Sequence, residues 1–187
     1  GIGLPTLVAD HLPMNREILL HSENGILGMG PVAQRESADP WIVNAGKQNV
    51  SLVRGASLFH HADSFAMIRG GHIDLCVLGA FEVAANGDLA NWTTSSDDRS
   101  PAVGGAMDLA TGARNVWVMT QHVTKSGEPK LVEQCRYPLT ARKAVGRAYS
   151  DLAVIDITPN GFSVRAMAPG VTPALLQDLT GAPLQFP

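Results

Sequence analysis

A single carboxylate, Glu23, stands between a short apolar run and an asparagine-glycine turn in the sequence Ser-Glu-Asn-Gly at residues 22–25. A carboxylate can act as a base, a metal ligand or a nucleophile, and its surroundings decide among these roles. The neighbouring residues offer no partner for the first two roles. Two interpretations therefore stay open: a nucleophile, and a solvated turn residue of the kind that is common where a loop begins.

Small residues follow Glu23 at unusual density. Asn24 and Gly25 form the turn, and Gly28 and Gly30 come soon after it. Because glycine has no side chain, a wall made of these residues would let a bulky ligand approach the backbone. We therefore predict that Asn24, Gly25, Gly28 and Gly30 bind a ligand beside Glu23.

A second glycine cluster lies in the sequence Val-Gly-Gly-Ala-Met-Asp-Leu-Ala at residues 103–110. Gly104 and Gly105 precede a predicted short helix, whose free N–H groups could hold an anion or an oxyanion. An equally good interpretation is that glycine is used there only for its backbone angles.

Other chemistries find less support in the sequence. His60 and His61 are adjacent, and no histidine pair has the HxH or HxxxH spacing of a metal site. No G-x-S-x-G elbow of a serine hydrolase is present. The first residues, GIGLPT, lack the third glycine and the Lys-Ser/Thr ending of a phosphate-binding loop, so they predict only a tight turn.

Composition narrows the class of protein. The 187 residues fit one domain, and the net charge of −3 with 17% charged residues argues against a nucleic-acid partner. The two cysteines lack CxxC spacing and favour a reducing cytoplasm. Apolar runs are far shorter than the roughly 20 residues that cross a bilayer. The sequence predicts a soluble protein without a membrane partner.

The expected elements alternate between helices and strands. The N-terminal half predicts a helix from Pro5, a strand at 17–22, a glycine-rich loop at 23–31, strands at 41–46 and 49–55, a helix at 62–71 and a strand at 72–80. The last strand is apolar without alternation, which is typical of a strand covered on both faces. The fold class is therefore α/β, an open and mostly parallel sheet between helix layers. Glu23 would then follow the carboxyl end of a strand, where such sheets bind ligands.

The C-terminal half continues the pattern. It predicts a long loop at 91–105, a helix at 104–113, strands at 115–123 and 129–135 across a turn at 125–128, a hairpin at 152–168 around Asn160-Gly161, and a helix from Pro173. Long loops inside compact domains are often functional.

Four segments, SENGILGMGP, GGHIDLCVLGA, NGDLANW and VGGAMDLATGA, resemble in this order the B (β) subunits of the 3-oxoacid coenzyme A transferases. The resemblance covers essentially the whole chain, as one domain at 1–187. Members of that family usually have a further helix and strand before GIGLPT. Residues 91–113 are most similar to members whose acceptor is 3-oxoadipate, and an acetoacetate-using member of the same type is the alternative.

The resemblance implies an open α/β fold and a role for each candidate residue. Glu23 would be the nucleophile of a ping-pong transfer from succinyl-CoA through a glutamyl-CoA thioester, and Gly104 or Gly105 would donate to an oxyanion. No metal and no permanently bound cofactor is needed. The partner would be an A (α) subunit, in an αβ or α2β2 assembly, without which this chain is inactive.

Two further alternatives belong to other classes. A sugar-phosphate isomerase or deaminase relative would share the architecture, and fold alone does not decide function. In a non-catalytic binding subunit, Glu23 would be only a turn residue.

Overall fold

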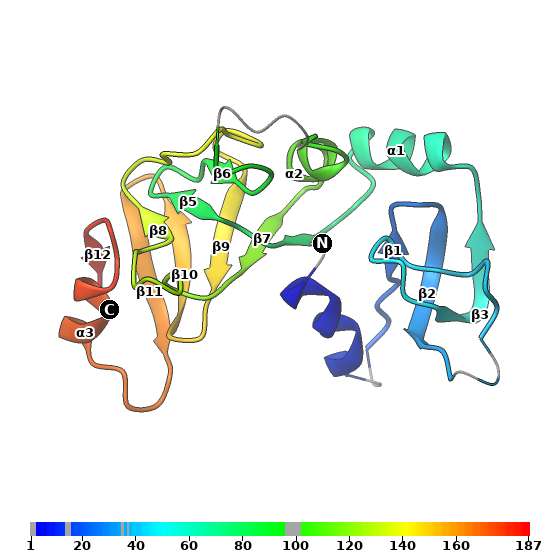
Figure 1. Ribbon diagram of the computed structural model, residues 1–187, viewed down its shortest axis with the longest axis horizontal. Helices are drawn as coiled ribbons and strands as arrows, with labels where there is room; N and C mark the ends of the chain where they lie inside the picture. Colours follow the sequence, from blue (N-terminus) through cyan, green and yellow to red (C-terminus); the bar gives the residue numbers. More distant parts are fainter. Residues whose placement is uncertain (1–2, 14–15, 35, 37, 96–101) are drawn as a thin grey trace.

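The structure is a computed structural model that describes residues 3–13, 16–34, 36, 38–95 and 102–187 (Figure 1). Its helices are η1 (Leu4–His11, a 3₁₀ helix), α1 (His61–Arg69), α2 (Ala106–Gly112) and α3 (Pro173–Asp178). Its strands are β1 (His21–Ser22), β2 (Ile26–Val32), β3 (Val50–Leu58), β4 (Cys76–Leu78), β5 (Glu82–Ala84), β6 (Leu89–Ala90), β7 (Val116–Met119), β8 (Leu131–Val132), β9 (Val145–Tyr149), β10 (Ala153–Thr158), β11 (Gly161–Met167) and β12 (Leu184–Gln185). The start of the predicted GIGLPT turn, residues 1–2, and the middle of the predicted long loop, residues 96–101, lie outside the described residues.

The central sheet has six strands in the order β12-β11-β10-β9-β7-β4. Neighbours β4 and β7, β7 and β9, and β11 and β12 run parallel, whereas β9, β10 and β11 pair antiparallel. The predicted α/β class with a mostly parallel sheet is confirmed, and the antiparallel strands β9, β10 and β11 make the sheet a mixed one.

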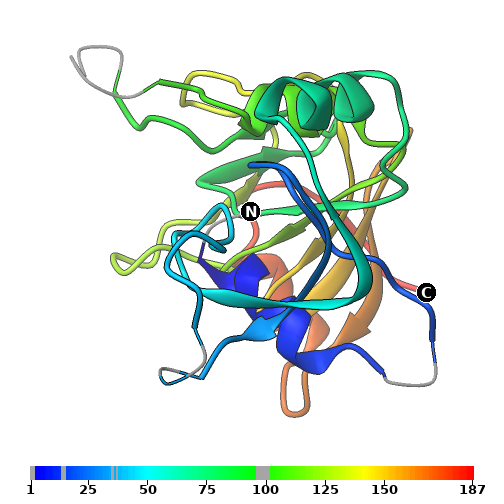
Figure 2. The ribbon, with the colours of Figure 1, turned by 90° about the vertical axis from the view of Figure 1, so that its right-hand side faces the viewer.

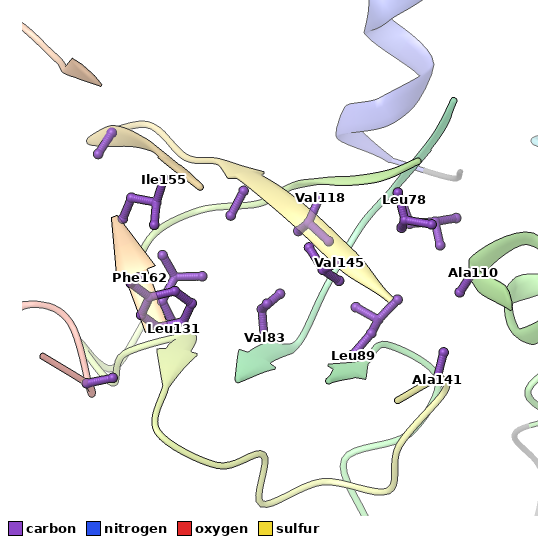
Figure 3. Close-up of a cluster of buried hydrophobic side chains, with 14 of the residues drawn as sticks. Leu78, Val83, Leu89, Ala110, Val118, Leu131, Ala141, Val145, Ile155 and Phe162 are labelled. Atoms are coloured by element: carbon purple, nitrogen blue, oxygen red, sulfur yellow. The ribbon is translucent and has the colours of Figure 1, made fainter. Parts of the chain in front are cut away.

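A small sheet, β6-β5-β8, covers part of the central sheet and closes the main core (Figure 3). Side chains of the small sheet meet those of the central strands, and the innermost of them are at most 1% exposed: Val83, Leu89, Leu131, Val118, Ile155 and Phe162. Burying one such side chain stabilises the fold by about 1.5–3 kcal/mol. This core holds the central sheet in place.

The predicted C-terminal hairpin and helix are both confirmed. Strands β10 and β11 pair through Thr158 and Gly161, and Gly161 has the positive φ of 98° that its place in the turn requires. Thr172 caps α3 by accepting a hydrogen bond from the Leu175 amide at 3.2 Å, and Pro173 opens the helix.

The N-terminal region differs from the prediction. The glycine-rich segment predicted as a loop forms β2, which pairs antiparallel with β1 on one side and β3 on the other. The strand predicted at 17–22 shrinks to the two residues of β1. The strand predicted at 41–46 is absent, because that segment contributes only a bridge between Val43 and Asn49. Glu23 therefore follows a strand of a separate antiparallel sheet, not of the central parallel one.

The strands predicted at 115–123 and 129–135 pair only next to the turn, through an antiparallel bridge between Val123 and Pro129, and not along their length. Strand β7 lies in the central sheet, whereas β8 pairs parallel with β5 in the small sheet. The intervening turn does form, since the Thr124 amide donates to the carbonyl of Glu128 at 2.8 Å. Leu131 is nevertheless drawn into the core, where it is 1% exposed, and this burial outweighs a local hairpin.

Helix α1 bridges the N-terminal sheet and the rest of the protein (Figure 1). Figure 2, viewed from the side of β1–β3, shows α1 at one end of the molecule. A Cβ at Gly112 of α2 would lie 2.4 Å from the carbonyl oxygen of Ile68, so the two helices meet backbone to backbone. Arg69 adds a two-pronged bond to Asp108, at 2.8 and 3.1 Å.

One histidine is wholly buried in the C-terminal half. His122 is 0% exposed, with Nδ1 2.9 Å from Ser150 Oγ and Nε2 2.9 Å from Thr180 Oγ1. The Thr180 hydroxyl donates a hydrogen bond to the carbonyl of Leu176. It therefore accepts its hydrogen bond from His122, and Nε2 is the donor. Burial lowers the pKa of His122, and the imidazole is neutral in the folded protein.

Acidification below the ordinary histidine pKa of 6.5 is expected to destabilise the fold through His122. The unfolded chain binds the proton there, whereas the folded protein resists it. The stabilisation is thus present above that pH and lost as the pH falls toward the lower folded-state pKa, by at most about 1.4 kcal/mol per pH unit. Thermal unfolding at about pH 7.5 and 5.5 measures the loss. His122→Gln should lose less on acidification, and an equal loss would contradict the assignment.

Candidate active site

The turn that carries Glu23 is closed by Gly25. Strands β1 and β2 pair through Ser22 and Ile26, which leaves Glu23, Asn24 and Gly25 to form the turn. Gly25 has a φ of 119°, and a Cβ there would lie 2.2 Å from the carbonyl oxygen of Phe59. Only glycine fits this position, so the conformation of the turn, and with it the backbone position of Glu23, is fixed.

A neighbouring loop, residues 39–49, is held against this turn. Asn24 Nδ2 donates to the carbonyl of Val43 at 2.7 Å, and Ser22 Oγ accepts from the Ala45 amide at 3.0 Å. The Asn24 side chain therefore fixes the loop. Its predicted contact with a ligand stays a prediction.

The two glycines of β2 face β3. A Cβ at Gly28, whose φ is 83°, would lie 3.0 Å from Ala56 Cα, and one at Gly30 would lie 2.5 Å from Ser51 Oγ. Strand packing is enough to explain both glycines. Their predicted ligand contact likewise stays a prediction.

Glu23 and Gly105, which are distant in sequence, lie side by side. Glu23 Oε1 is 3.2 Å from the point that a Cβ on Gly105 would occupy, and Phe65 Cζ is 2.7 Å from the same point. Gly105 thus presents bare backbone to the partly buried carboxylate, with the Phe65 ring beside both. The structure brings together one residue from each predicted glycine-rich cluster.

The two glycines before α2 differ in conformation. Gly104 has a left-handed φ of 56°, whereas Gly105, at φ −71° and ψ −10°, is the N-cap directly before α2. Within the described residues, neither backbone amide donates to another group. Of these two residues, Gly105 is the one whose backbone lies beside the Glu23 carboxylate.

Charge and burial shape the surroundings of Glu23. Cys76, 6% exposed at the start of β4, has its thiol pKa raised to about 11 by burial, and the negative charge of Glu23 acts in the same direction. The thiol therefore stays protonated and unreactive at neutral pH. Burial also lowers the pKa of His21, so this imidazole is neutral at physiological pH.

Sequence analysis missed His21, Ser64 and Phe65. His21 Nε2 lies 2.7 Å from Ser64 Oγ, and Phe65 contacts the site at Gly105. Ser64 and Phe65 belong to α1, where sequence periodicity marks them only as core positions. For His21, the only signal in the sequence was its position two residues before Glu23.

Other features of the molecule lie away from Glu23. A cavity of about 730 Å³ is lined by Thr94, Ser95, Glu128, Arg136, Tyr137, Pro138 and Leu139, and includes neither Glu23 nor Gly105. Among the described residues, no group of three or more histidine, cysteine or acidic side chains could hold a metal ion. In the same part of the chain, no helix is long and apolar enough to span a membrane.

Known proteins share this architecture. An acyl-CoA transferase of Escherichia coli O157:H7 superposes with a TM-score of 0.76 over 100% of this chain and 38% of its own, at 17% identity. The glutaconate coenzyme A-transferase of Acidaminococcus fermentans gives a TM-score of 0.63 over 87% of this chain and 68% of its own, at 14% identity. At these identities the likeness shows the fold alone. This chain spans well under half of the first structure.

Sequence comparison defines the family. The coenzyme A transferase family matches residues 1–175. The B subunit of the 3-oxoadipate CoA-transferase of Acinetobacter baylyi is 55% identical over 98% of this chain and 85% of the relative. The B subunit of the succinyl-CoA:3-ketoacid coenzyme A transferase of Helicobacter pylori is 45% identical over 97% and 87%, respectively. This chain therefore belongs to the coenzyme A transferase family, an enzyme family, and the resemblance inferred from its sequence is confirmed. The isomerase alternative is set aside.

Proposed function

We propose that this chain is the catalytic subunit of a transferase that moves CoA from succinyl-CoA to 3-oxoadipate. The 55% identity to the B subunit of the A. baylyi 3-oxoadipate CoA-transferase supports this acceptor. The second candidate is a 3-ketoacid such as acetoacetate, supported by the 45% identity to the H. pylori relative. Initial rates with the two acceptors at equal concentration separate these candidates.

Glu23 is the nucleophile of the proposed reaction. Its carboxylate attacks the thioester carbonyl of succinyl-CoA and gives a mixed anhydride and CoA thiolate. The thiolate then attacks the glutamyl carbonyl, which releases succinate and leaves CoA as a thioester on Glu23. The same steps run in reverse with 3-oxoadipate, so the activation of the acyl group is conserved without a metal or a bound cofactor.

The observation that carries the proposal is the 3.2 Å between Glu23 Oε1 and the missing Cβ position of Gly105. Each attack creates an oxyanion, and one preorganised donor is worth on the order of 3 kcal/mol in the transition state. The backbone amide of Gly104 or Gly105 is the proposed donor. Asn24, Gly25, Gly28 and Gly30 are the proposed wall along which the CoA arm lies.

An A subunit completes the proposed enzyme, in an αβ or α2β2 assembly. Both of the relatives described above are B subunits, which supports a partner for this chain. Large apolar side chains at the N-terminal end stay exposed on this chain alone, with Trp41 at 88%, Leu19 at 60% and Leu58 at 56%. Such side chains suit an interface that a second protein chain covers. The partner also supplies the second oxyanion donor, so the chain alone is inactive.

Intact-mass spectrometry of this chain co-expressed with its A subunit tests the nucleophile. Incubated with succinyl-CoA alone, this chain should gain the mass of CoA less water, and Glu23→Gln in an equally well-formed complex should gain nothing. An adduct that persists in Glu23→Gln would place the reaction at another residue. A folded wild-type complex without any adduct would instead favour a non-catalytic binding subunit.

A further inference from the structure

His21, two residues before Glu23, and Ser64 form a hydrogen bond. His21 Nε2 lies 2.7 Å from Ser64 Oγ, and Ser64 is 0% exposed. His21 belongs to β1 and Ser64 to α1, so the bond joins the strand that carries Glu23 to the bridging helix. The edge of the His21 ring also packs on Phe59, with ring centroids 5.7 Å apart.

The strand β1 is short and lies at a sheet edge. It has only two residues and is paired with β2 alone. On the other side of Glu23, the turn is tied by the Phe59 amide, which donates to the carbonyl of Gly25 at 3.0 Å. Two side-chain bonds hold the near side of Glu23: Ser22 Oγ accepts from the Ala45 amide of the loop, and the His21–Ser64 bond ties β1 to α1.

Helix α1, which holds β1 through Ser64, also contacts Gly105. Phe65, the residue after Ser64, lies against Gly105 with Cζ 2.7 Å from the missing Cβ position. One turn further along, Arg69 holds Asp108 of α2 through two hydrogen bonds. One helix thus contacts both the strand before Glu23 and the backbone that Glu23 faces.

We propose that the His21–Ser64 hydrogen bond sets the spacing between the Glu23 carboxylate and the backbone at Gly105, and that both residues are positioning residues of the transfer reaction. The inference rests on the proposed nucleophile. His21 Nε2 is occupied by Ser64, so the imidazole acts through the position of Glu23 and does not itself exchange protons with substrate.

Three variants probe the bond in the complex of this chain with its A subunit. Ser64→Ala removes the hydroxyl partner. The amide nitrogen of glutamine reaches the place of His Nε2, whereas that of asparagine reaches the place of Nδ1. His21→Gln should therefore keep the bond to Ser64, and His21→Asn should lose it.

The measurement is the single-turnover rate of adduct formation on this chain as succinyl-CoA is varied. Because a displacement of about 1 Å costs on the order of 10²-fold in rate, Ser64→Ala and His21→Asn should be about 10- to 100-fold slower at saturation. The half-saturating concentration should change by less than about twofold, because the CoA contacts are untouched. His21→Gln should stay within about threefold of wild type.

Thr180→Val is the matched control. It removes a bond of the same kind, that between His122 and Thr180, near α3 at the far end of the molecule (Figure 1). Its melting temperature should fall as in Ser64→Ala, whereas its rate of adduct formation should stay within about twofold of wild type.

The outcomes are distinct. A wild-type rate in Ser64→Ala would overturn the positioning role while leaving the nucleophile established. Equal slowing in Thr180→Val would assign the loss to general destabilisation and would overturn it as well. A His21→Gln variant as slow as His21→Asn would contradict the Nε2 geometry. Failure of wild type to form any adduct would remove the proposed function itself.

Discussion

Glu23→Asp is expected to lower kcat for CoA transfer by about 100-fold, although the variant keeps a carboxylate. The shorter side chain withdraws its oxygens by about 1.5 Å, one C–C bond, from the backbone at Gly105. In wild type, Oε1 lies 3.2 Å from the missing Cβ position of Gly105, so a withdrawal of this size moves the oxygen of the proposed nucleophile well out of its place. Because Glu23→Asp keeps the carboxylate and changes only its position, a loss of activity shows that the position matters. Glu23→Gln removes the carboxylate itself and cannot show this.

Steady-state kinetics of the purified complex with succinyl-CoA and 3-oxoadipate measure the effect. KM should change little, because the substrates bind through other groups. Glu17→Asp is the control, since it makes the same change on an exposed carboxylate upstream of β1. If Glu23→Asp kept more than about a tenth of wild-type kcat, the carboxylate position would not limit the reaction.

Local signals in the sequence predicted the C-terminal elements correctly. The Asn160-Gly161 hairpin and the helix capped by Thr172 depend on backbone angles and on hydrogen bonds between near neighbours. Neither requires knowledge of distant residues. The sequence therefore contains enough information for both.

Distant contacts decided the elements that the sequence mispredicted. Glycines at 28 and 30 favour a loop locally, yet the approach of Ala56 and Ser51 on β3 uses the space that they leave. The residues around Leu131 resembled the second strand of a hairpin, but β8 pairs with β5, which is far away in the sequence. Burial between sheets outweighed the local turn in this case.

The candidate site was predictable where composition marked it. Glu23 stood out by its glycine neighbours, and Gly105 by the second glycine cluster. Their proximity was implied only by the family resemblance, and the role of α1 was not predicted at all. Ser64 and Phe65 look like ordinary core residues until the helix is placed between the two clusters.

Gly105→Ala is expected to reduce CoA transfer about 100-fold, through steric displacement alone. The backbone at Gly105, with φ −71° and ψ −10°, accepts any residue without strain, so the added methyl group is the whole perturbation. That methyl would lie 2.7 Å from Phe65 Cζ and 3.2 Å from Glu23 Oε1, so the ring, the carboxylate or both must move. Gly105→Val should block transfer more completely.

Association with the A subunit should survive both substitutions, and size-exclusion chromatography of the complex checks this directly. Gly146→Ala provides the matched control, because its added Cβ would find only the Val116 carbonyl oxygen, at a relaxed 3.9 Å. Comparing the kinetics of the Gly105→Ala and Gly146→Ala complexes with wild type then shows the effect of the same added methyl group at a crowded and at an open position. Full activity in Gly105→Ala would mean that the Glu23 carboxylate reacts elsewhere, and it would remove both the proposed oxyanion donor and the spacing that α1 is proposed to set. If Gly105→Ala lost CoA-transfer activity and Gly146→Ala kept it, the reaction would depend on the close packing of Glu23, Phe65 and the backbone before α2.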